Sequence, residues 1–305
     1  MKMIELRDEY LSGTIDKHSF INKMHKEHQV LFEYQKLLDN SEVESISISS
    51  DSVICSMKNG VKLFVDPYDR RFIPIEILNF KSFDPIELTL IRKIVNQSRT
   101  VLDVGANIGW YSASFSKMNP RVAVHAFEPI PYTFDYLQRH ISLNQCDNVK
   151  LNNFALSDSE GVAEFYWGQD ETGSSSMKNI QERPHAQKVK CKLETLDSYC
   201  NLHNLDVDFI KCDVEGAELS VFKGALSTLK NSKPVIFTEM LRKWSAKFGY
   251  HPNDIIELLN PLGYQAYAFE SGEFQLFESI TETTEATNFF FFDKTKHNNI
   301  LNEFK

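Results

Sequence analysis

The sequence predicts a mixed α/β fold built around a mainly parallel β-sheet. From residue 101 onward, short apolar runs typical of buried strands alternate with helix-like segments. The first unit runs from an apolar segment, Val101–Val104, through a glycine turn and a helical segment, Trp110–Met118, into a second apolar segment, Ala123–Phe127. Alternation of this kind predicts parallel strands covered by helices on both faces.

The rest of this region follows the same rhythm. Further strands are expected at Val149–Leu156, Val207–Cys212, Val235–Thr238, Tyr264–Phe269 and Phe289–Phe292, and further helices at Tyr132–Leu143, Ala217–Leu229 and Pro252–Leu259. Between residues 156 and 207 the helical rhythm lapses, and two strands, Val162–Trp167 and Lys188–Leu193, flank a polar loop over residues 168–187. A long loop of this kind fits a cap over a ligand or a flexible surface linker.

The first eighty residues have a different pattern. Residues 1–41 show helical periodicity with Asp16 as an N-cap, and Asn59-Gly60 between alternating runs indicates a β-hairpin. A helix over Pro85–Gln97 follows, with Asp84 as its N-cap. We therefore predict a helical and hairpin element over residues 1–82, a main domain over 83–294 and a tail over 295–305. The N-terminal helices are expected to pack on the main domain or on another subunit, which makes a homo-oligomer possible.

Composition excludes several classes. The chain has 305 residues and a formal net charge of −9, which argues against a general nucleic-acid binder. No apolar stretch approaches the roughly 20 residues that cross a bilayer, and the N-terminus lacks a signal-peptide core. The five cysteines are scattered and odd in number, which favours isolated thiols over disulfides or a zinc site. We therefore expect a cytoplasmic protein.

The glycine turn of the first unit is typical of a nucleotide site. Gly105 and Gly109 let the backbone turn sharply and let a ligand approach closely. Glu128 follows at the end of the second strand, where a carboxylate accepts hydrogen bonds from ribose hydroxyls. A dinucleotide site requires a glycine at the position of Asn107 and a third glycine later. S-adenosylmethionine has no phosphate and fits better, its amino-acid end meeting Asp103 and backbone amides. An NAD-type oxidoreductase and a turn that binds nothing are the alternatives.

Acidic residues end several strands at the same edge of the predicted sheet, where ligands bind in open α/β folds. They are Asp103, Glu128, Asp158, Asp213 with Glu215, and Glu239. So many acids at one edge require a cation or a polar ligand. A divalent cation held by Asp213, Glu215 and Glu239 is one explanation, since Mg²⁺ prefers such ligands; the site prediction itself contains no metal.

Several segments closely resemble the FkbM family of S-adenosylmethionine-dependent methyltransferases. They are Asp103–Gly109, Glu128-Pro129, Ala155–Asp158, Ile210–Glu218 and Phe222–Ala225, in the family's order. The match covers about residues 84–270, and the Asp-x-Glu-Gly-x-Glu segment at 213–218 is its most specific part. The resemblance implies a Rossmann-like, seven-stranded class I methyltransferase sheet with the final strand antiparallel. It also implies O-methylation of small-molecule or saccharide hydroxyls, with S-adenosylhomocysteine as product.

The resemblance also implies roles for individual residues. Gly105, Asn107 and Gly109 would surround the methionine part of the cofactor, Glu128-Pro129 would hold the ribose, and Ala155-Leu156 would flank the adenine. Asp213 would lie beside the methionine amine or the transferring methyl. The expected acceptor is a sugar, a nucleotide-linked sugar or a saccharide precursor, as in polysaccharide biosynthesis.

An alcohol acceptor requires a general base within hydrogen-bond reach. Glu239 and Glu215 are the favoured candidates, followed by Asp213 and by His185 on the polar loop. For Glu218 a structural role is equally possible, because acids in the first turn of a helix stabilise its dipole. A non-catalytic binding module that keeps the fold remains a further alternative.

Overall fold

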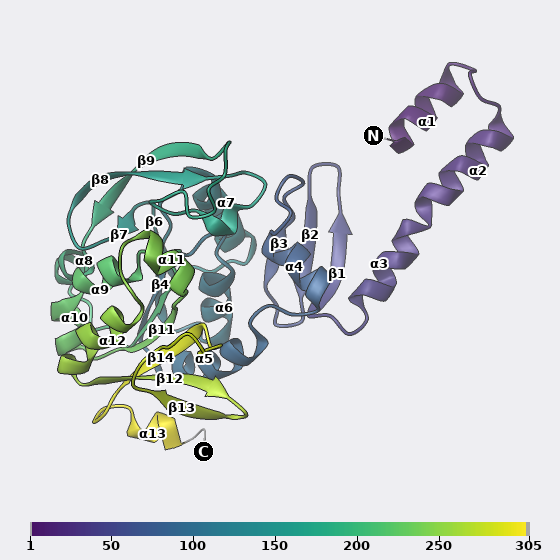
Figure 1. Ribbon diagram of the computed structural model, residues 1–305. Coiled ribbons are helices and arrows are strands. Elements are labelled where there is room, and N and C mark those ends of the chain that lie inside the picture. The colour runs from purple at the N-terminus through teal and green to yellow at the C-terminus, as the bar shows by residue number, and fades with distance from the viewer. Residues whose placement is uncertain (1, 303–305) are drawn as a thin grey trace.

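The computed structural model describes residues 2–302, and its centre is an eight-stranded sheet in the order β13-β12-β14-β11-β10-β4-β5-β6 (Figure 1). The strands are β4 (Thr100–Val104), β5 (Ala123–Phe127), β6 (Val149–Asn152), β10 (Phe209–Cys212), β11 (Val235–Glu239), β12 (Tyr264–Glu270), β13 (Glu273–Phe277) and β14 (Asn288–Asp293). β4, β5, β6, β10 and β11 pair in parallel, and β14 is antiparallel to both of its neighbours. The predicted fold class and its antiparallel last strand are confirmed. The edge strand β13 is an eighth strand that the sequence did not predict.

Helices cover both faces of this sheet. One face packs against α5 (Pro85–Gln97), α6 (Trp110–Met118) and α7 (Pro131–Leu143), with α13 (Asn298–Asn302) at its margin, and the other packs against α8 (Leu196–His203), α9 (Glu218–Lys223), α10 (Leu226–Asn231) and α12 (Asn253–Leu259). The aromatic run of β14 serves both cores, because Phe290 and Phe292 point into the first and Phe289 and Phe291 into the second. All four rings are buried, as the continuous apolar run predicts.

Two predicted elements are interrupted in the structure. The strand predicted over Val149–Leu156 ends at Asn152, and β7 (Ala155–Leu156) leaves the main sheet to pair with β9 (Gln187–Glu194). With β8 (Gly161–Trp167), these strands form a separate three-stranded sheet. The helix predicted over Ala217–Leu229 breaks at Gly224, where an added Cβ would lie 2.0 Å from the carbonyl oxygen of Ser157. This close approach brings the end of α9 against the segment that follows β7.

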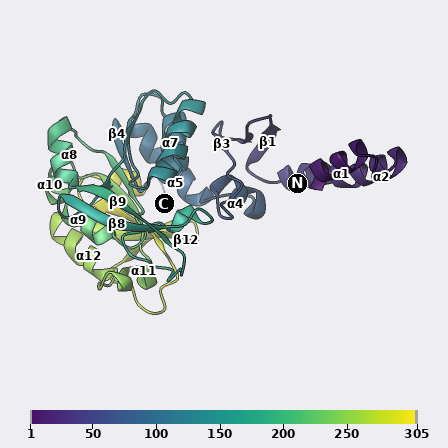
Figure 2. The same cartoon turned by 90° about the horizontal axis from the view of Figure 1, so that it is seen from above.

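The N-terminal element contains helices and a β-hairpin, as predicted, together with a further strand and α4. It has three helices, α1 (Lys2–Leu11), α2 (Lys17–His28) and α3 (Val30–Leu38), then an antiparallel sheet of β1 (Val43–Ile48), β2 (Val53–Met57) and β3 (Lys62–Phe64), then α4 (Ile73–Phe80). Asp16 caps α2 as expected, accepting hydrogen bonds from the amides of His18 and Ser19. Asn59-Gly60 forms the turn between β2 and β3. The helices α1–α3 form an arm that projects away from the body (Figures 1 and 2).

The small sheet is joined to the main domain through α7. The His140 ring nitrogen Nε2 accepts a hydrogen bond from the Phe64 amide at 2.9 Å, and its Nδ1 lies 2.7 Å from the carbonyl oxygen of Ile108. Asn144 exchanges two hydrogen bonds with the backbone of Lys62. Burial lowers the pKa of His140 to about 4, so this contact contains a neutral imidazole at neutral pH. The N-terminal element is thereby tied to the segment that carries the glycine turn.

The structure also shows the state of the cysteines and the character of the helices. All five cysteines are free and buried. Within residues 2–302, no helix has both the length and the apolar character that crossing a bilayer requires. The division of the chain at residues 82 and 294 stays a prediction.

Candidate active site

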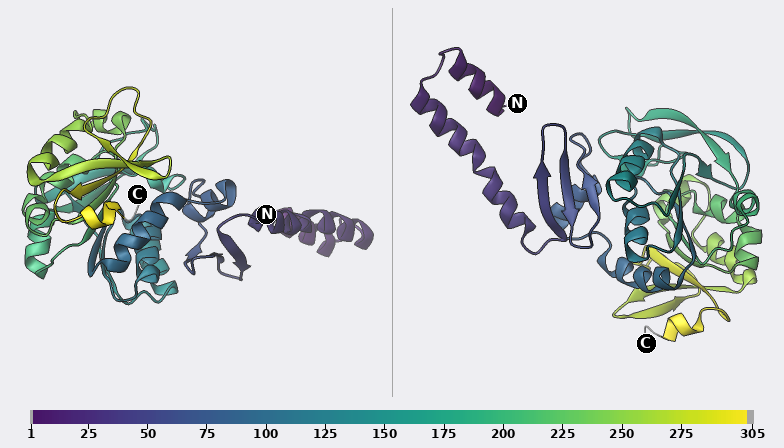
Figure 3. Two further views of the ribbon diagram at one scale, coloured as in Figure 1. Left: turned by 90° about the horizontal axis from the view of Figure 1, so that it is seen from below. Right: turned by 180° about the vertical axis from the view of Figure 1, so that it is seen from behind.

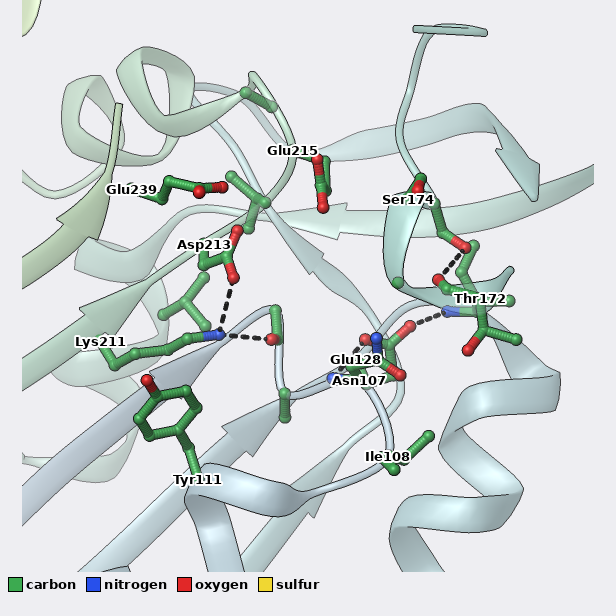
Figure 4. A pocket seen from close by; sticks show the side chains of 18 of the residues that line it. Asn107, Ile108, Tyr111, Glu128, Thr172, Ser174, Lys211, Asp213, Glu215 and Glu239 are labelled. Carbon is green, nitrogen blue, oxygen red and sulfur yellow. Dashed lines mark hydrogen bonds and ion pairs between the residues drawn. The ribbon is translucent and has the colours of Figure 1, made fainter. Parts of the chain in front are cut away.

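A cavity of about 410 Å³ opens at the carboxyl ends of β4, β5, β10 and β11 (Figure 4). Its lining includes most of the residues that the sequence analysis selected: Gly105, Asn107, Glu128, Pro129, Ala155, Leu156, Asp213, Glu215 and Glu239. Asp103, Gly109 and His185 are not among the lining residues. The sheet edge therefore brings together nine of the twelve predicted site residues, from four strand ends and β7.

The glycine turn packs directly against the end of β10. Gly105 has φ +74°, and a Cβ added to it would lie 1.8 Å from the carbonyl oxygen of Asp213. The Lys211 ammonium donates a hydrogen bond of 2.8 Å to the carbonyl oxygen of Gly105. Only glycine accommodates both this backbone conformation and this contact. The turn and the Asp213 segment thus form one rigid wall of the cavity.

Gly109 has a different role from the one predicted. It begins α6 with φ +89°, and a Cβ there would lie 2.5 Å from Cδ1 of Leu137. Gly109 therefore permits α6 to pack on α7 and does not face the cavity.

Glu128 is buried at the end of β5 and orders the loops around it. One carboxylate oxygen accepts a hydrogen bond of 2.9 Å from the Asn107 amide. The other accepts from the Ile130 amide at 2.9 Å and from the Thr133 hydroxyl at 2.7 Å. Burial raises the pKa of Glu128, and these hydrogen bonds oppose that shift. Glu128 holds the glycine turn and still contributes to the lining of the cavity.

Lys211 was not predicted as a site residue, although it lies at the centre of this arrangement. Its ammonium is buried 3.6 Å from a carboxylate oxygen of Asp103 and 3.7 Å from one of Asp213. Burial alone lowers the pKa of Lys211, but the attraction of Asp213 and Asp103 outweighs it and the net shift is upward. Asp103 accepts a hydrogen bond from Ser112 and is fully buried. It therefore forms an ion pair with Lys211 behind the cavity wall and does not line the cavity.

Glu215 and Glu239 stand near Asp213 at the opposite end of the cavity from Glu128 (Figure 4). Burial, followed by repulsion from Asp213, raises the pKa of Glu239 to about 8 and that of Glu215 well above its usual range. At neutral pH Glu239 is therefore largely protonated, and a nearby cation would favour loss of that proton. No group of three or more His, Cys, Asp or Glu side chains within residues 2–302 is arranged to hold a metal ion.

Glu218 has a structural role in the neighbouring loop. Its Oε1 accepts hydrogen bonds from the amides of Val214 and Gly216, at 3.0 and 3.1 Å, and its Oε2 accepts from the hydroxyl of Tyr250. These contacts fix the chain between Asp213 and α9. The structural interpretation of Glu218 is thus the better one.

Asp84 occupies the predicted N-cap position of α5, but its side chain does not cap the helix. It precedes α5, but its backbone is left-handed at φ +47° and its side chain makes no capping hydrogen bond. Its carboxylate instead accepts a hydrogen bond of 2.6 Å from the Tyr111 hydroxyl, and the residue lines the cavity. Burial raises the pKa of Asp84 to about 6. Asp84 is therefore an additional ionisable group on the acidic side of the cavity.

The polar loop over residues 168–187 lies over the cavity. Its short 3₁₀ turn, Thr172–Ser174, lines the cavity, and Thr172 donates two hydrogen bonds to the buried carboxylate of Asp69. The Ser176 hydroxyl donates to the carbonyl oxygen of Glu215 at 2.8 Å. These contacts support the cap interpretation over the linker interpretation. His185 is exposed on the same loop and does not reach the cavity, so its selection as a base is not supported.

Residues of the N-terminal element complete the other side of the cavity. Arg71, which forms ion pairs with Glu76 and Glu171, lines it together with Phe72 and Ile73. Lys243 and Trp244, on α11 (Arg242–Lys247), face the same space. No pattern in the sequence indicates that these segments approach the sheet edge.

Comparison with known proteins identifies the family. A family model described as "Methyltransferase FkbM domain" matches residues 103–266, which is more than half of the chain. The chain belongs to the FkbM methyltransferase family. The matched range begins at β4 and ends within β12, so it contains the glycine turn, Glu128, β7 and the carboxylates of Asp213, Glu215 and Glu239.

Individual known proteins match parts of the chain. The chain is 31% identical to "Methyltransferase sdnD" from Sordaria araneosa over 153 residues, covering 41% of this chain and 59% of that protein. It is 26% identical to "2-O-methyltransferase NoeI" from Sinorhizobium fredii, over 46% of this chain and 62% of that protein. The chain thus spans about six tenths of the length of these relatives. A crystal structure of an FkbM methyltransferase from Methylobacillus flagellatus has 17% identity and a TM-score of 0.41, covering 64% of this chain and 44% of that one.

Proposed function

We propose that this chain is an S-adenosylmethionine-dependent O-methyltransferase that methylates a hydroxyl group of a sugar or a related saccharide. The observation that carries this proposal is the cavity between the glycine turn and the carboxylates of β10 and β11. It combines a ribose-binding acid, Glu128, with an acidic end of the kind that attracts a sulfonium cation. Membership of the FkbM family supports the same reaction.

The residues present fit this cofactor. The side-chain oxygen atoms Asn107 Oδ1 and Asp213 Oδ1 are buried in the cavity wall without a hydrogen-bond partner. Buried polar atoms are nearly always paired, so these two suit the polar amino-acid end of a ligand. Glu128, with Pro129, would hold the ribose, and Ala155-Leu156 would flank the adenine. S-adenosylmethionine supplies a methyl group already activated by its bond to a positively charged sulfur.

The chain's own contribution is to position the acceptor and remove its proton. The rigid contact of Gly105 with Asp213 and the ion pairs of Lys211 fix the cavity wall, and alignment of reacting groups contributes several kcal/mol. Glu239, or Glu215 beside it, would accept the hydroxyl proton. Glu239 is suited to this role because its raised pKa, about 8, lies closer to neutrality than that of an ordinary carboxylate, and burial raises the pKa of Glu215 in the same direction.

The acceptor is proposed from the chemistry of the remaining lining. Arg71, Glu76, Lys243 and Asn288 offer hydrogen bonds, and Trp244 and Phe72 offer apolar surface. Alternating polar groups and aromatic rings are suited to a hydroxylated ring. The relative named a 2-O-methyltransferase supports a hydroxyl as the methylated group. Mass spectrometry of candidate sugars and nucleotide-linked sugars, incubated with enzyme and S-adenosylmethionine, tests this directly through a methylated product; transfer to nitrogen or carbon alone would refute it.

Glu128→Ala is expected to weaken S-adenosylhomocysteine binding by roughly ten- to a hundredfold, because a charged hydrogen-bond acceptor contributes about 1.5 to 3 kcal/mol. Calorimetry measures this affinity. Thr133→Val is the matched control, since it removes one hydrogen bond to Glu128 and leaves the carboxylate in place. Unchanged affinity in Glu128→Ala would contradict the ribose assignment. Binding of NADH in place of S-adenosylhomocysteine would favour an oxidoreductase.

The affinity for S-adenosylmethionine is expected to rise with pH between about 6 and 8. Glu239 has a pKa of about 8 and is largely protonated below that pH, whereas the sulfonium charge favours the ionised carboxylate. Binding should therefore release protons, with at most about a tenfold gain in affinity per pH unit for each proton. S-adenosylhomocysteine lacks the sulfonium charge and should show a flatter profile. If the affinities for the two ligands depended on pH in the same way, the ionisation of these acids would not affect binding of the sulfonium group.

A further inference from the structure

The N-terminal arm, defined as α1–α3 over residues 2–38, carries an excess of exposed apolar side chains. Eight of the sixteen exposed large apolar residues among residues 2–302 lie on it. Five of these are on α3: Val30, Leu31, Phe32, Tyr34 and Leu37, with Phe32 60% exposed. Figure 3 shows the arm extending from the body, so nothing in the described chain covers these residues.

The arm is nevertheless an ordered helical hairpin at its far end. The ring of Tyr10 stacks on that of Phe20 at 4.7 Å, and Leu6 is buried between α1 and α2. Lys2 forms an ion pair of 2.6 Å with Glu27. These contacts join α1 to α2 but leave α3 uncovered. The exposed apolar side chains of α3 thus belong to an ordered helical arm.

α3 has an uncovered apolar face. At 100° per residue, Val30, Leu31, Tyr34 and Leu37 lie within about 120° of one another, and Phe32 lies on the other side with the polar residues Glu33, Gln35 and Lys36. An amphipathic helix normally packs its apolar face against another element. The body contacts the end of α3 through β1 and α4. Within residues 2–302, the apolar face of α3 therefore remains largely exposed.

We propose that the arm is a dimerisation element that packs antiparallel against the arm of a second copy of this chain. The charge distribution supports this occupant. Residues 2–38 contain six Lys and Arg and six Asp and Glu, so their formal charge is zero, whereas the whole chain carries −9. Two acidic bodies repel each other, but their arms meet without net repulsion. A neutral surface also lacks the basic excess that binding to nucleic acid or an anionic membrane requires.

Charge and length also favour the antiparallel orientation. α2 has three lysines, Lys17, Lys23 and Lys26, against one acid, whereas α3 has one of each sign. A parallel pair would place the basic α2 helices together, and an antiparallel pair places each α2 against the partner's α3. The α2–α3 rod is roughly 33 Å long at 1.5 Å per residue. Antiparallel pairing therefore holds the two bodies at opposite ends, several Debye lengths apart.

Sedimentation or light scattering of the full chain tests this proposal. The wild type should have twice the mass of one chain at micromolar concentration, also at high salt, because the interface is apolar. Leu31→Glu/Leu37→Glu should have the mass of one chain and keep its affinity for S-adenosylhomocysteine. Leu202→Glu is the matched control: Leu202 is 76% exposed on α8, and its variant should remain a dimer. A wild type with the mass of one chain would overturn the proposal, and so would a double variant that still has the mass of two. Co-flotation of a monomeric wild type with lipid vesicles would also overturn it.

Cysteine crosslinking tests the orientation. In an antiparallel pair, Lys26 lies near the same residue of the second copy, because it is near the middle of the rod and on the Val30–Leu37 face, whereas Lys17 at one end does not. The native cysteines are all buried and contribute no background. Lys26→Cys should form a disulfide-linked dimer on mild oxidation, and Lys17→Cys should not. Crosslinking through Lys17→Cys, or none through Lys26→Cys, would contradict the antiparallel pair.

Discussion

Gly105→Ala is expected to abolish measurable binding of S-adenosylhomocysteine. The added Cβ would lie 1.8 Å from the carbonyl oxygen of Asp213, a backbone atom that cannot move alone. The left-handed backbone at φ +74° adds about 1 to 2 kcal/mol for any residue with a side chain. The turn and the end of β10 must therefore separate, which displaces Asn107 and Asp213 together. Calorimetry gives the affinity and thermal unfolding gives the accompanying loss of stability.

Gly60→Ala is the matched control for this substitution. Gly60 has φ +86°, but no atom lies within 4 Å of the Cβ it would acquire. Its variant bears the backbone penalty without the collision and should keep full affinity for the ligand. Normal binding by Gly105→Ala would show that the turn is not part of the ligand site.

Glu239→Gln is expected to lower kcat by roughly a hundred- to ten-thousandfold, which is the usual contribution of a general base. At neutral pH the Glu239 carboxyl is largely protonated, so an amide is close in shape and charge. The affinity for S-adenosylhomocysteine should therefore change little. Single-turnover and steady-state rates with an acceptor identified by mass spectrometry measure the effect.

Glu215→Gln and Glu164→Gln complete this experiment. Glu215 is the alternative base, so a larger loss of kcat in Glu215→Gln than in Glu239→Gln would transfer the role to it. Glu164 is an exposed residue of β8 paired with Lys188, and its variant should retain full activity. Full activity in both Glu239→Gln and Glu215→Gln would refute a carboxylate base at this end of the cavity.

The side of the cavity proposed to bind the cofactor was predictable because its signals are local in the sequence. β4, the glycine turn, α6 and β5 follow one another directly, and Glu128 ends the second strand of this unit. Parallel strands align their carboxyl ends, so Asp213 and Glu239 could be assigned to the same edge from their positions alone. The choice of Asp103 and Gly109 was less accurate, because a strand residue and a helix-packing glycine resemble site residues in sequence.

The side proposed to bind the acceptor was not predictable because distant segments form it. Arg71 and Phe72 reach the cavity only through the docking of β3 on α7 by His140 and Asn144. Asp84 resembled a helix cap, and only the structure shows its carboxylate bound to Tyr111. Lys211 did carry a signal: a lysine inside a buried strand requires an acidic partner, and Asp103 lies beside it on the adjacent strand.

A structure of the full chain with S-adenosylhomocysteine tests the central claim most directly. We expect the ribose hydroxyls on the Glu128 carboxylate, the adenine beside Ala155-Leu156, and the amino-acid end at Asn107 and Asp213, with the sulfur facing Glu239 and Glu215. A ligand bound elsewhere, or a cavity that stays empty at saturating ligand, would contradict the account.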